Sequence, residues 1–176
     1  LQQGDILLSG ELSGLRPGGL QRVVPRKAYA GDLIALWLEH LVRLAAAVPG
    51  IAPQSQLFAE DGVHGFGTDD GDGAPLDAAG LLHAWLLRYR QGQSQPLPFF
   101  ARTSLAYARA KPGQELDAAQ NEWAPDFTGF GRSPQRDDAA NLLVFRHQEP
   151  LSDPLFAQLA ETLLKPMVGA LKAGEE

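Results

Sequence analysis

Apolar residues recur at intervals of three and four along three stretches of the chain, which is the spacing of one helix face. Each stretch follows a residue whose side chain can cap a helix N-terminus. The predicted helices therefore run from Asp32 to about residue 48, from Asp77 to about residue 90, and onward from Ser152 or Asp153. Tyr89 falls on the apolar stripe of the second helix, and Pro166 is expected to kink the third.

Alternating and β-branched runs, separated by turn residues, predict strands before and between these helices. Residues 16–19 form a predicted turn, because Pro presets φ at its first corner and Gly supplies a positive φ at the next. This turn joins a first strand within residues 5–12 to a second strand over residues 20–24. Two more strands are expected, at residues 54–59 and, more weakly, at residues 64–68.

Polar, Gly-rich and Pro-rich segments connect these elements. The acidic run 68–73 is expected to be a solvated loop, because its spacing differs from that of a calcium loop and no Glu stands at the twelfth position. Short helices are expected from Thr103 and over residues 116–123, followed by a mobile loop over residues 125–136. The polar tail 172–176 is expected to fray.

Composition restricts the class of protein. The chain has 176 residues, of which 44% are hydrophobic and 20% charged, so we expect residues 1–176 to form a single globular domain. It has no apolar run long enough for a membrane span, and its lack of Cys fits a reducing compartment. Because the chain opens on Leu1 without a basic and apolar leader, we expect a domain cut from a longer protein.

The predicted hairpin leads into a long amphipathic helix and carries a Lys after its second strand, an arrangement that resembles PD-(D/E)XK nucleases of the RecB type. Those nucleases carry Gly-x-hydrophobic-Asp on the first strand and Val-Val-Asp-Tyr-Lys on the second, and the two acids hold a divalent metal. At the matching positions this chain has Ser13 and Pro25, followed by Lys27. Neither Ser nor Pro replaces a carboxylate on Mg²⁺, so we expect no catalytic residue and no metal at this hairpin.

Further segments resemble, in order and spacing, the C-terminal region of the RecC family, the gamma chains of exodeoxyribonuclease V. These segments are residues 36–41, 89–92, 96–100, 103–106 and 150–151, together with Trp123, Phe145, Arg146, Phe156, Leu159 and Ala160. The resemblance implies a PD-(D/E)XK restriction-endonuclease-like α/β fold, a central mixed β-sheet flanked by helices, that has lost its active site. It also implies a bacterial cytoplasmic complex with RecB-type and RecD-type helicase chains and DNA, without a cofactor or small-molecule ligand for this domain.

Cations gather in residues 10–27 although the chain has a net charge of −6. They are Arg16, Arg22, Arg26 and Lys27. This cluster either binds DNA phosphates or is an exposed charged hairpin, and both interpretations are kept.

A second candidate contact is an extended segment with two adjacent aromatic residues. It consists of Pro96, Leu97, Pro98, Phe99 and Phe100. Its aromatic rings need burial, which either the core of this domain or a docked partner can provide.

Two other functions stay open. A divergent nuclease would use Glu11 and Lys27, with Asp5 or Asp32 completing a displaced metal site. The other alternative is an unrelated α+β interaction module. Nuclease ancestry requires the second strand to lie inside a mixed sheet, beside the first strand, with the helix from Asp32 packed across it.

The chain has four histidines, at positions 40, 64, 83 and 147. None of them forms the i, i+4 pair that binds a metal on a helix. Each is therefore expected to be a surface or half-buried residue.

Overall fold

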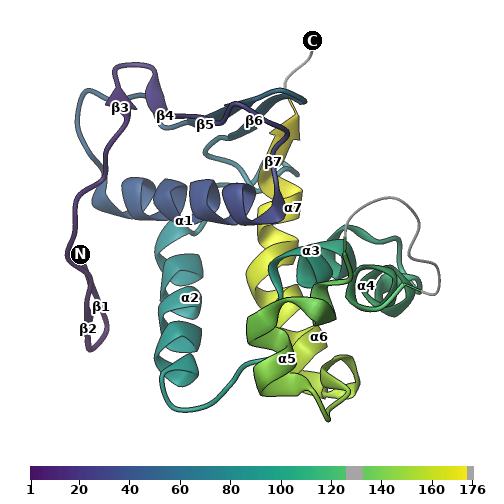
Figure 1. Ribbon diagram of the computed structural model, residues 1–176. Helices are drawn as coiled ribbons and strands as arrows, with labels where there is room; N and C mark the ends of the chain where they lie inside the picture. Colours follow the sequence, from purple (N-terminus) through teal and green to yellow (C-terminus); the bar gives the residue numbers. More distant parts are fainter. Residues whose placement is uncertain (126–132, 174–176) are drawn as a thin grey trace. The chain divides into compact units, whose positions relative to one another are not determined.

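The computed structural model describes residues 1–125 and 133–173, and the chain divides into two compact units (Figure 1). We call the first the sheet unit, formed by Leu1–Tyr89 and Gly169–Glu176, and the second the helical unit, Arg90–Val168. The expectation that residues 1–176 form a single domain stays a prediction.

The sheet unit is built on a five-stranded mixed sheet with the strand order β3-β4-β5-β6-β7. The strands are β3 (Leu15–Arg16), β4 (Gly19–Val23), β5 (Ser55–Ala59), β6 (Gly62–Phe66) and β7 (Leu171–Ala173). Strands β4 and β5 are parallel, and every other pair is antiparallel. Helix α1 (Ala30–Ala46) connects the parallel pair and packs against β5 and β6. The expected α/β class with a mixed sheet and flanking helices is confirmed.

The turn between β3 and β4 forms at Pro17 and Gly18, as predicted, but the positive φ expected at Gly18 is found instead at Gly19. Gly19 follows with φ of 118°, and a Cβ there would overlap the carbonyl oxygen of Gln54. Only glycine allows this close approach, which lets the amide of Leu20 donate to the same carbonyl at 3.0 Å. The turn thus starts β4 in register with β5.

The first predicted strand is wrong over most of its length. Only Ile6–Leu7 (β2) within residues 5–12 is a strand, and it pairs with β1 (Gln2–Gln3) in a separate two-stranded sheet. The neighbour of β4 is instead β3, which lies closer to the turn. Gly14 has φ of 76°, a value that interrupts an extended strand, so the chain enters the main sheet only after it.

The C-terminal tail is also not as predicted. Residues 171–173 form β7, which pairs antiparallel with β6 and completes the sheet. The Nζ of Lys172 donates to Oδ2 of Asp69 at 2.7 Å. Pairing uses backbone groups, so a polar segment joins a sheet edge once helix α7 (Lys165–Ala170) delivers it there. Residues 174–176 lie outside the described part.

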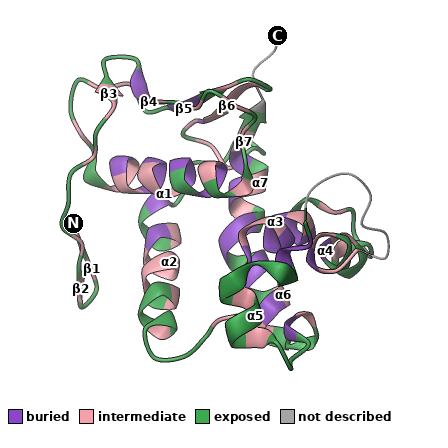
Figure 2. Ribbon diagram, in the orientation of Figure 1, coloured by how far each residue is buried: buried purple, intermediate pink, exposed green. Residues whose placement is uncertain are grey.

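Helix α1 begins earlier than predicted, and Asp32 is not its N-cap residue. Tyr29 is its N-cap residue, and Asp32 in the first turn accepts a hydrogen bond from the Tyr29 amide at 2.8 Å. Its apolar stripe is buried, with Leu36 and Trp37 at or below 1% exposure. Figure 2 shows buried and exposed residues alternating along α1. Helix α2 (Ala78–Gly92) forms after Asp77 as expected, but Tyr89 is 69% exposed, so its predicted burial is wrong.

His40 lies fully inside the core of the sheet unit, so its expected surface or half-buried position is wrong. Its Nε2 lies 2.8 Å from the carbonyl oxygen of Gly67, which can only accept, so Nε2 carries the proton. Nδ1 then accepts from the hydroxyl of Ser55 at 2.9 Å. Burial lowers the pKa of His40 to about 4, because the charged ring loses its hydration.

The helical unit contains short helices around one aromatic core. They are α3 (Ala101–Arg109), α4 (Glu115–Trp123), η1 (Gln135–Asp137), α5 (Ala139–Phe145), η2 (Pro150–Ser152), α6 (Pro154–Leu159), η3 (Ala160–Leu164) and the start of α7. The core cluster contains Phe100, Tyr107, Trp123 and Phe156. Residues 126–132 of the predicted mobile loop lie outside the described residues, whereas residues 135–137 form the 3-10 helix η1.

The helix starts of this unit were predicted with mixed success. Asp153 caps α6, because its Oδ1 accepts from the Leu155 amide at 2.9 Å, as expected. Thr103 is not a cap, since α3 starts after Phe100. The Thr103 amide and hydroxyl instead both donate to Oε1 of Gln135, at 2.8 and 2.9 Å.

The segment ahead of Pro166 is the π-helical turn η3 (Ala160–Leu164). Such turns often accompany interrupted helix hydrogen bonding. The kink expected at Pro166 stays a prediction.

Candidate functional site

Arg22 contacts Ser13, the residue that stands where RecB-type nucleases carry the first metal-binding acid. Arg22 of β4 shares the face of Leu20, and it reaches Glu39 on α1 through two parallel hydrogen bonds. These join Nε to Oε2 at 2.8 Å and Nη2 to Oε1 at 2.6 Å. The third nitrogen, Nη1, donates to the hydroxyl of Ser13 at 3.1 Å. Ser13, at the position of the first nuclease acid, therefore contacts a guanidinium group.

The local backbone holds Ser13 beside β4. The amide of Gln21 donates to the carbonyl oxygen of Gly14 at 3.0 Å, which keeps residues 13–14 alongside the strand. A Cβ on Gly14 would lie 2.7 Å from the Gln21 carbonyl oxygen, so this approach also requires glycine. The arrangement of Ser13, Arg22 and Glu39 thus follows from the backbone path as well as from the side chains.

The pair is electrostatically favourable. The hydrogen bonds that Arg22 donates to Glu39 raise the pKa of Arg22, and each side chain keeps about 30% of its surface exposed (31% and 29%). A bidentate carboxylate–guanidinium pair satisfies both charges with fixed geometry. Sequence reasoning did not identify Glu39. The available signal was an acid within the apolar segment 36–41, where a carboxylate facing a sheet needs a cationic partner.

Pro25, at the position of the second nuclease acid, cannot bind a metal cation through its side chain either. Pro25 is exposed and follows the end of β4, and Lys27 is exposed two residues later. The carbonyl oxygen of Lys27 accepts from Nη1 of Arg26 at 2.9 Å. Among the described residues, no hydrogen bond or ion pair joins the Lys27 side chain to Ser13 or Glu11, so the structure does not assemble these candidates into one site.

The predicted cationic cluster divides into two pairs with different surroundings. Arg26 forms two hydrogen bonds with Asp32, at 2.6 and 3.0 Å, and lies over the ring of Tyr29 at 4.2 Å. The hydrogen bond from Arg26 lowers the pKa of Asp32. Arg16 and Lys27 are exposed, and neither has a carboxylate partner within the described part of the chain. Two of the four cations are therefore already neutralised within the chain.

The acids predicted for a displaced metal site, Glu11 and Asp32, have different surroundings. Asp32 is held by Arg26, and Glu11 is exposed. Across residues 1–125 and 133–173, no group of three or more His, Cys, Asp or Glu side chains is placed to hold a metal. Glu11 and Glu39 instead border a groove of about 450 Å³ along α1 whose other lining is mostly apolar, including Leu12 and Leu38.

The extended segment 96–100 supplies part of the core of the helical unit. Phe100 is 3% exposed, and its ring centroid lies 4.3 Å from that of Trp123 and 5.2 Å from that of Phe145. Pro98 is buried as well, whereas Pro96 is exposed and Leu97 and Phe99 are half-buried. The buried positions of Pro98 and Phe100 fit core packing, and docking of a partner remains a prediction for Pro96, Leu97 and Phe99.

Comparison with known proteins assigns the chain to a protein family. No helix within the described ranges is both long and apolar enough to cross a bilayer. No curated protein matches the chain. Residues 1–112, from β1 through α3, match the family model for the RecC C-terminal domain. Because this match spans 112 of 176 residues, the chain belongs to the RecC C-terminal domain family.

Proposed function

We propose that this chain is the non-catalytic, nuclease-like part of a RecC-type subunit, in which it organises partner subunits and the DNA path during repair of double-strand breaks. Family membership supports the role in a RecBCD-type complex. The observation that carries the non-catalytic part is the contact of Arg22 with Glu39 and Ser13.

Divalent metal chemistry needs a site that attracts a cation. Mg²⁺ prefers carboxylate oxygens in octahedral geometry. Here Ser13 is neutral, Pro25 has no ligand atom in its side chain, and both oxygens of Glu39 accept from Arg22. A metal would have to displace the guanidinium group of Arg22 from Glu39 and leave that positive charge without its partner, which opposes metal binding.

The topology supports nuclease ancestry. Strand β4 lies inside a mixed sheet, and α1 packs across the neighbouring strands, as such an ancestry requires. The strand beside β4 is β3 rather than the predicted strand within residues 5–12. We take the fold to be a PD-(D/E)XK-like sheet whose first strand is reduced to two residues next to the turn.

The proposed role toward DNA is guidance rather than tight binding. Arg16 and Lys27 are the cluster members that are exposed and lack a carboxylate partner among the described residues. Two phosphate contacts on a chain of net charge −6 give a weak and salt-sensitive interaction. Such contacts suit a strand that passes over the surface while the helicase partners hold it.

A nuclease assay tests the non-catalytic assignment. The chain is incubated with single-stranded and duplex DNA in Mg²⁺ and in Mn²⁺, beside Lys27→Ala and Glu11→Gln. We expect no cleavage and no calorimetric signal on Mn²⁺ titration. Cleavage that disappears in Lys27→Ala, or a Mn²⁺ signal that disappears in Glu11→Gln, would establish the divergent nuclease instead.

A binding assay tests the subunit role. Purified RecB-type and RecD-type helicase chains are mixed with the chain, and complex formation is measured by size-exclusion chromatography with light scattering. We expect a complex with at least one helicase chain. Failure to bind either of them, alone or together, would favour the unrelated α+β interaction module.

A further inference from the structure

Helix α5 presents three consecutive large apolar side chains to solvent. Leu142, Leu143 and Val144 are 48%, 76% and 40% exposed, and none of the seven described residues of α5 is buried. Figure 2 accordingly draws most of this helix as exposed. Phe145 anchors α5 by an edge contact with Phe100 at 5.2 Å between centroids. Exposed apolar runs of this length typically mark an interaction surface.

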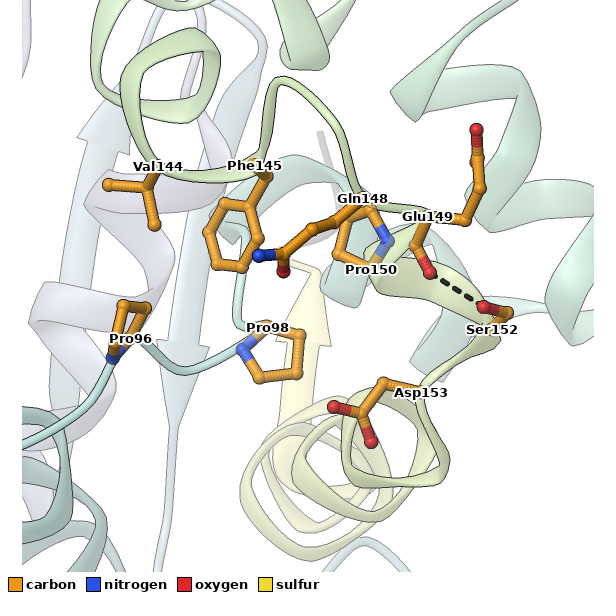
Figure 3. A pocket seen from close by; sticks show the side chains of 9 residues that line it. All are labelled: Pro96, Pro98, Val144, Phe145, Gln148, Glu149, Pro150, Ser152 and Asp153. Carbon is orange, nitrogen blue, oxygen red and sulfur yellow. Dashed lines mark hydrogen bonds between the residues drawn. The ribbon is translucent and has the colours of Figure 1, made fainter.

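A pocket of about 270 Å³ adjoins this helix and shares Val144 with it (Figure 3). Its lining residues are Pro96, Pro98, Val144, Phe145, Gln148, Glu149, Pro150, Ser152 and Asp153. Prolines have little conformational freedom to lose, and the hydroxyl of Ser152 fixes the turn η2 by donating to the Glu149 carbonyl oxygen at 2.7 Å. The pocket is therefore largely preorganised for a ligand.

The charge of the lining selects the kind of ligand. In Figure 3 the carboxylate of Asp153 points toward Pro98 and the amide of Gln148 lies beside the ring of Phe145, whereas the carboxylate of Glu149 points away from them. One oxygen of Asp153 accepts from the Leu155 amide, and the other has no hydrogen bond to any residue of the described ranges. Among the described residues that line the pocket there is no Lys or Arg. Acidic groups without cations repel phosphates and favour a positively charged partner.

We propose that α5 and this pocket together dock a protein segment that carries an apolar side chain beside a Lys or Arg. The apolar side chain enters between Pro96, Pro98 and Val144, and the cation pairs with Asp153. In taking the partner to be a protein chain of the complex, the inference rests on the proposed function. It adds the surface and the chemistry by which such a partner is recognised.

Fluorescence anisotropy with synthetic peptides tests this surface. The probes are three labelled peptides of roughly ten residues that are identical except at their centre, which reads Arg-Leu, Glu-Leu or Arg-Ser. We expect the Arg-Leu peptide to bind about fivefold to tenfold more tightly than either of the others. Equal binding of the Arg-Leu and Glu-Leu peptides would overturn the proposal.

Three variants locate the binding. Asp153→Asn keeps a residue that caps a helix equally well and removes the charge, so it should abolish the preference for Arg over Glu. Val144→Ser should weaken the Arg-Leu peptide about fivefold, because an apolar contact is lost. Leu116→Ser is the matched control, because Leu116 is also exposed, at 55%, on α4 of the same unit. An equal loss in the control would contradict the assignment to α5.

Other occupants give different results. Oligo(dT) binding that is lost in Val144→Ser would identify nucleic acid, and a dimer that dissociates in Leu143→Ser would identify a second copy of the chain. Either outcome would overturn the proposal. A chain that selects the Arg-Leu peptide but binds no helicase chain would refute the subunit role alone. The docking site on α5 and its pocket would be refuted alone by two results together. The chain would show no peptide preference, and Val144→Ser and Asp153→Asn would leave its binding to the helicase chains unchanged.

Discussion

Mild acid should destabilise the sheet unit through His40. The ring is fully buried and links α1 to β5 and to the segment after β6, through Ser55 and Gly67. Burial, together with the nearby charge of Arg43, lowers its pKa from 6.5 to about 4. The neutral ring is the form that both hydrogen bonds fit, because Nδ1 accepts and Nε2 donates.

The sign and size of the change in stability with pH follow from the difference between the folded and unfolded pKa of His40. Above pH 6.5 the ring is neutral in the folded and unfolded chains, so it contributes no pH dependence. Between pH 6.5 and about 4 only the unfolded chain takes up the proton, so stability falls as the pH falls. At 1.36 kcal/mol per pKa unit, the loss is about 2 kcal/mol near pH 5 and approaches about 3 kcal/mol below the folded pKa. Such a loss is a large part of a typical domain stability.

The assay is urea unfolding between about pH 7 and pH 4.5, followed on NMR amide signals of β4 and β5 because these strands belong to the sheet unit. His40→Gln should be less stable at neutral pH but should lose most of the slope in this window. His147→Gln, a change at an exposed histidine, should keep the slope. Asp32 and Asp61 have lowered pKa values and lose their contribution only near and below pH 3.8. Unchanged wild-type stability between pH 7 and 5, or a full slope in His40→Gln, would refute the reasoning.

Three further predictions concern the other contacts. Oligonucleotide binding should show a logarithmic salt slope of about −1.4 for two single-strand phosphate contacts rather than about −2.8 for four, and Arg16→Gln with Lys27→Gln should abolish it. A steeper slope that falls in Arg22→Gln would contradict this assignment. Glu39→Gln should cost roughly 1 kcal/mol in urea unfolding, because the pair with Arg22 is partly exposed, and a double-mutant cycle should show coupling between the two residues. Phe100→Ala should cost about 3–5 kcal/mol in unfolding of the helical unit, and a loss below about 1 kcal/mol would argue against its place in the core.

Local features of the chain were readable from the sequence. Helical spacing located α1, the Pro-Gly pair located the turn before β4, and Asp153 was one of the two residues predicted as the cap of the last helix. The missing acids at Ser13 and Pro25 were also visible directly. These features depend on residues within a few positions of each other, so periodicity, φ preferences and side-chain chemistry are sufficient to predict them.

Contacts between distant residues were decided only by the tertiary structure. Arg22 and Glu39 are 17 positions apart, and Asp69 and Lys172 are 103 apart. The burial of His40 likewise depends on Ser55 and on the segment after β6, which the helix pattern around residue 40 does not contain. By itself, the sequence determined that two acids are absent. The packing of α1 on the sheet determined that Glu39 pairs with the guanidinium group of Arg22, because that contact exists only when strand and helix are brought together.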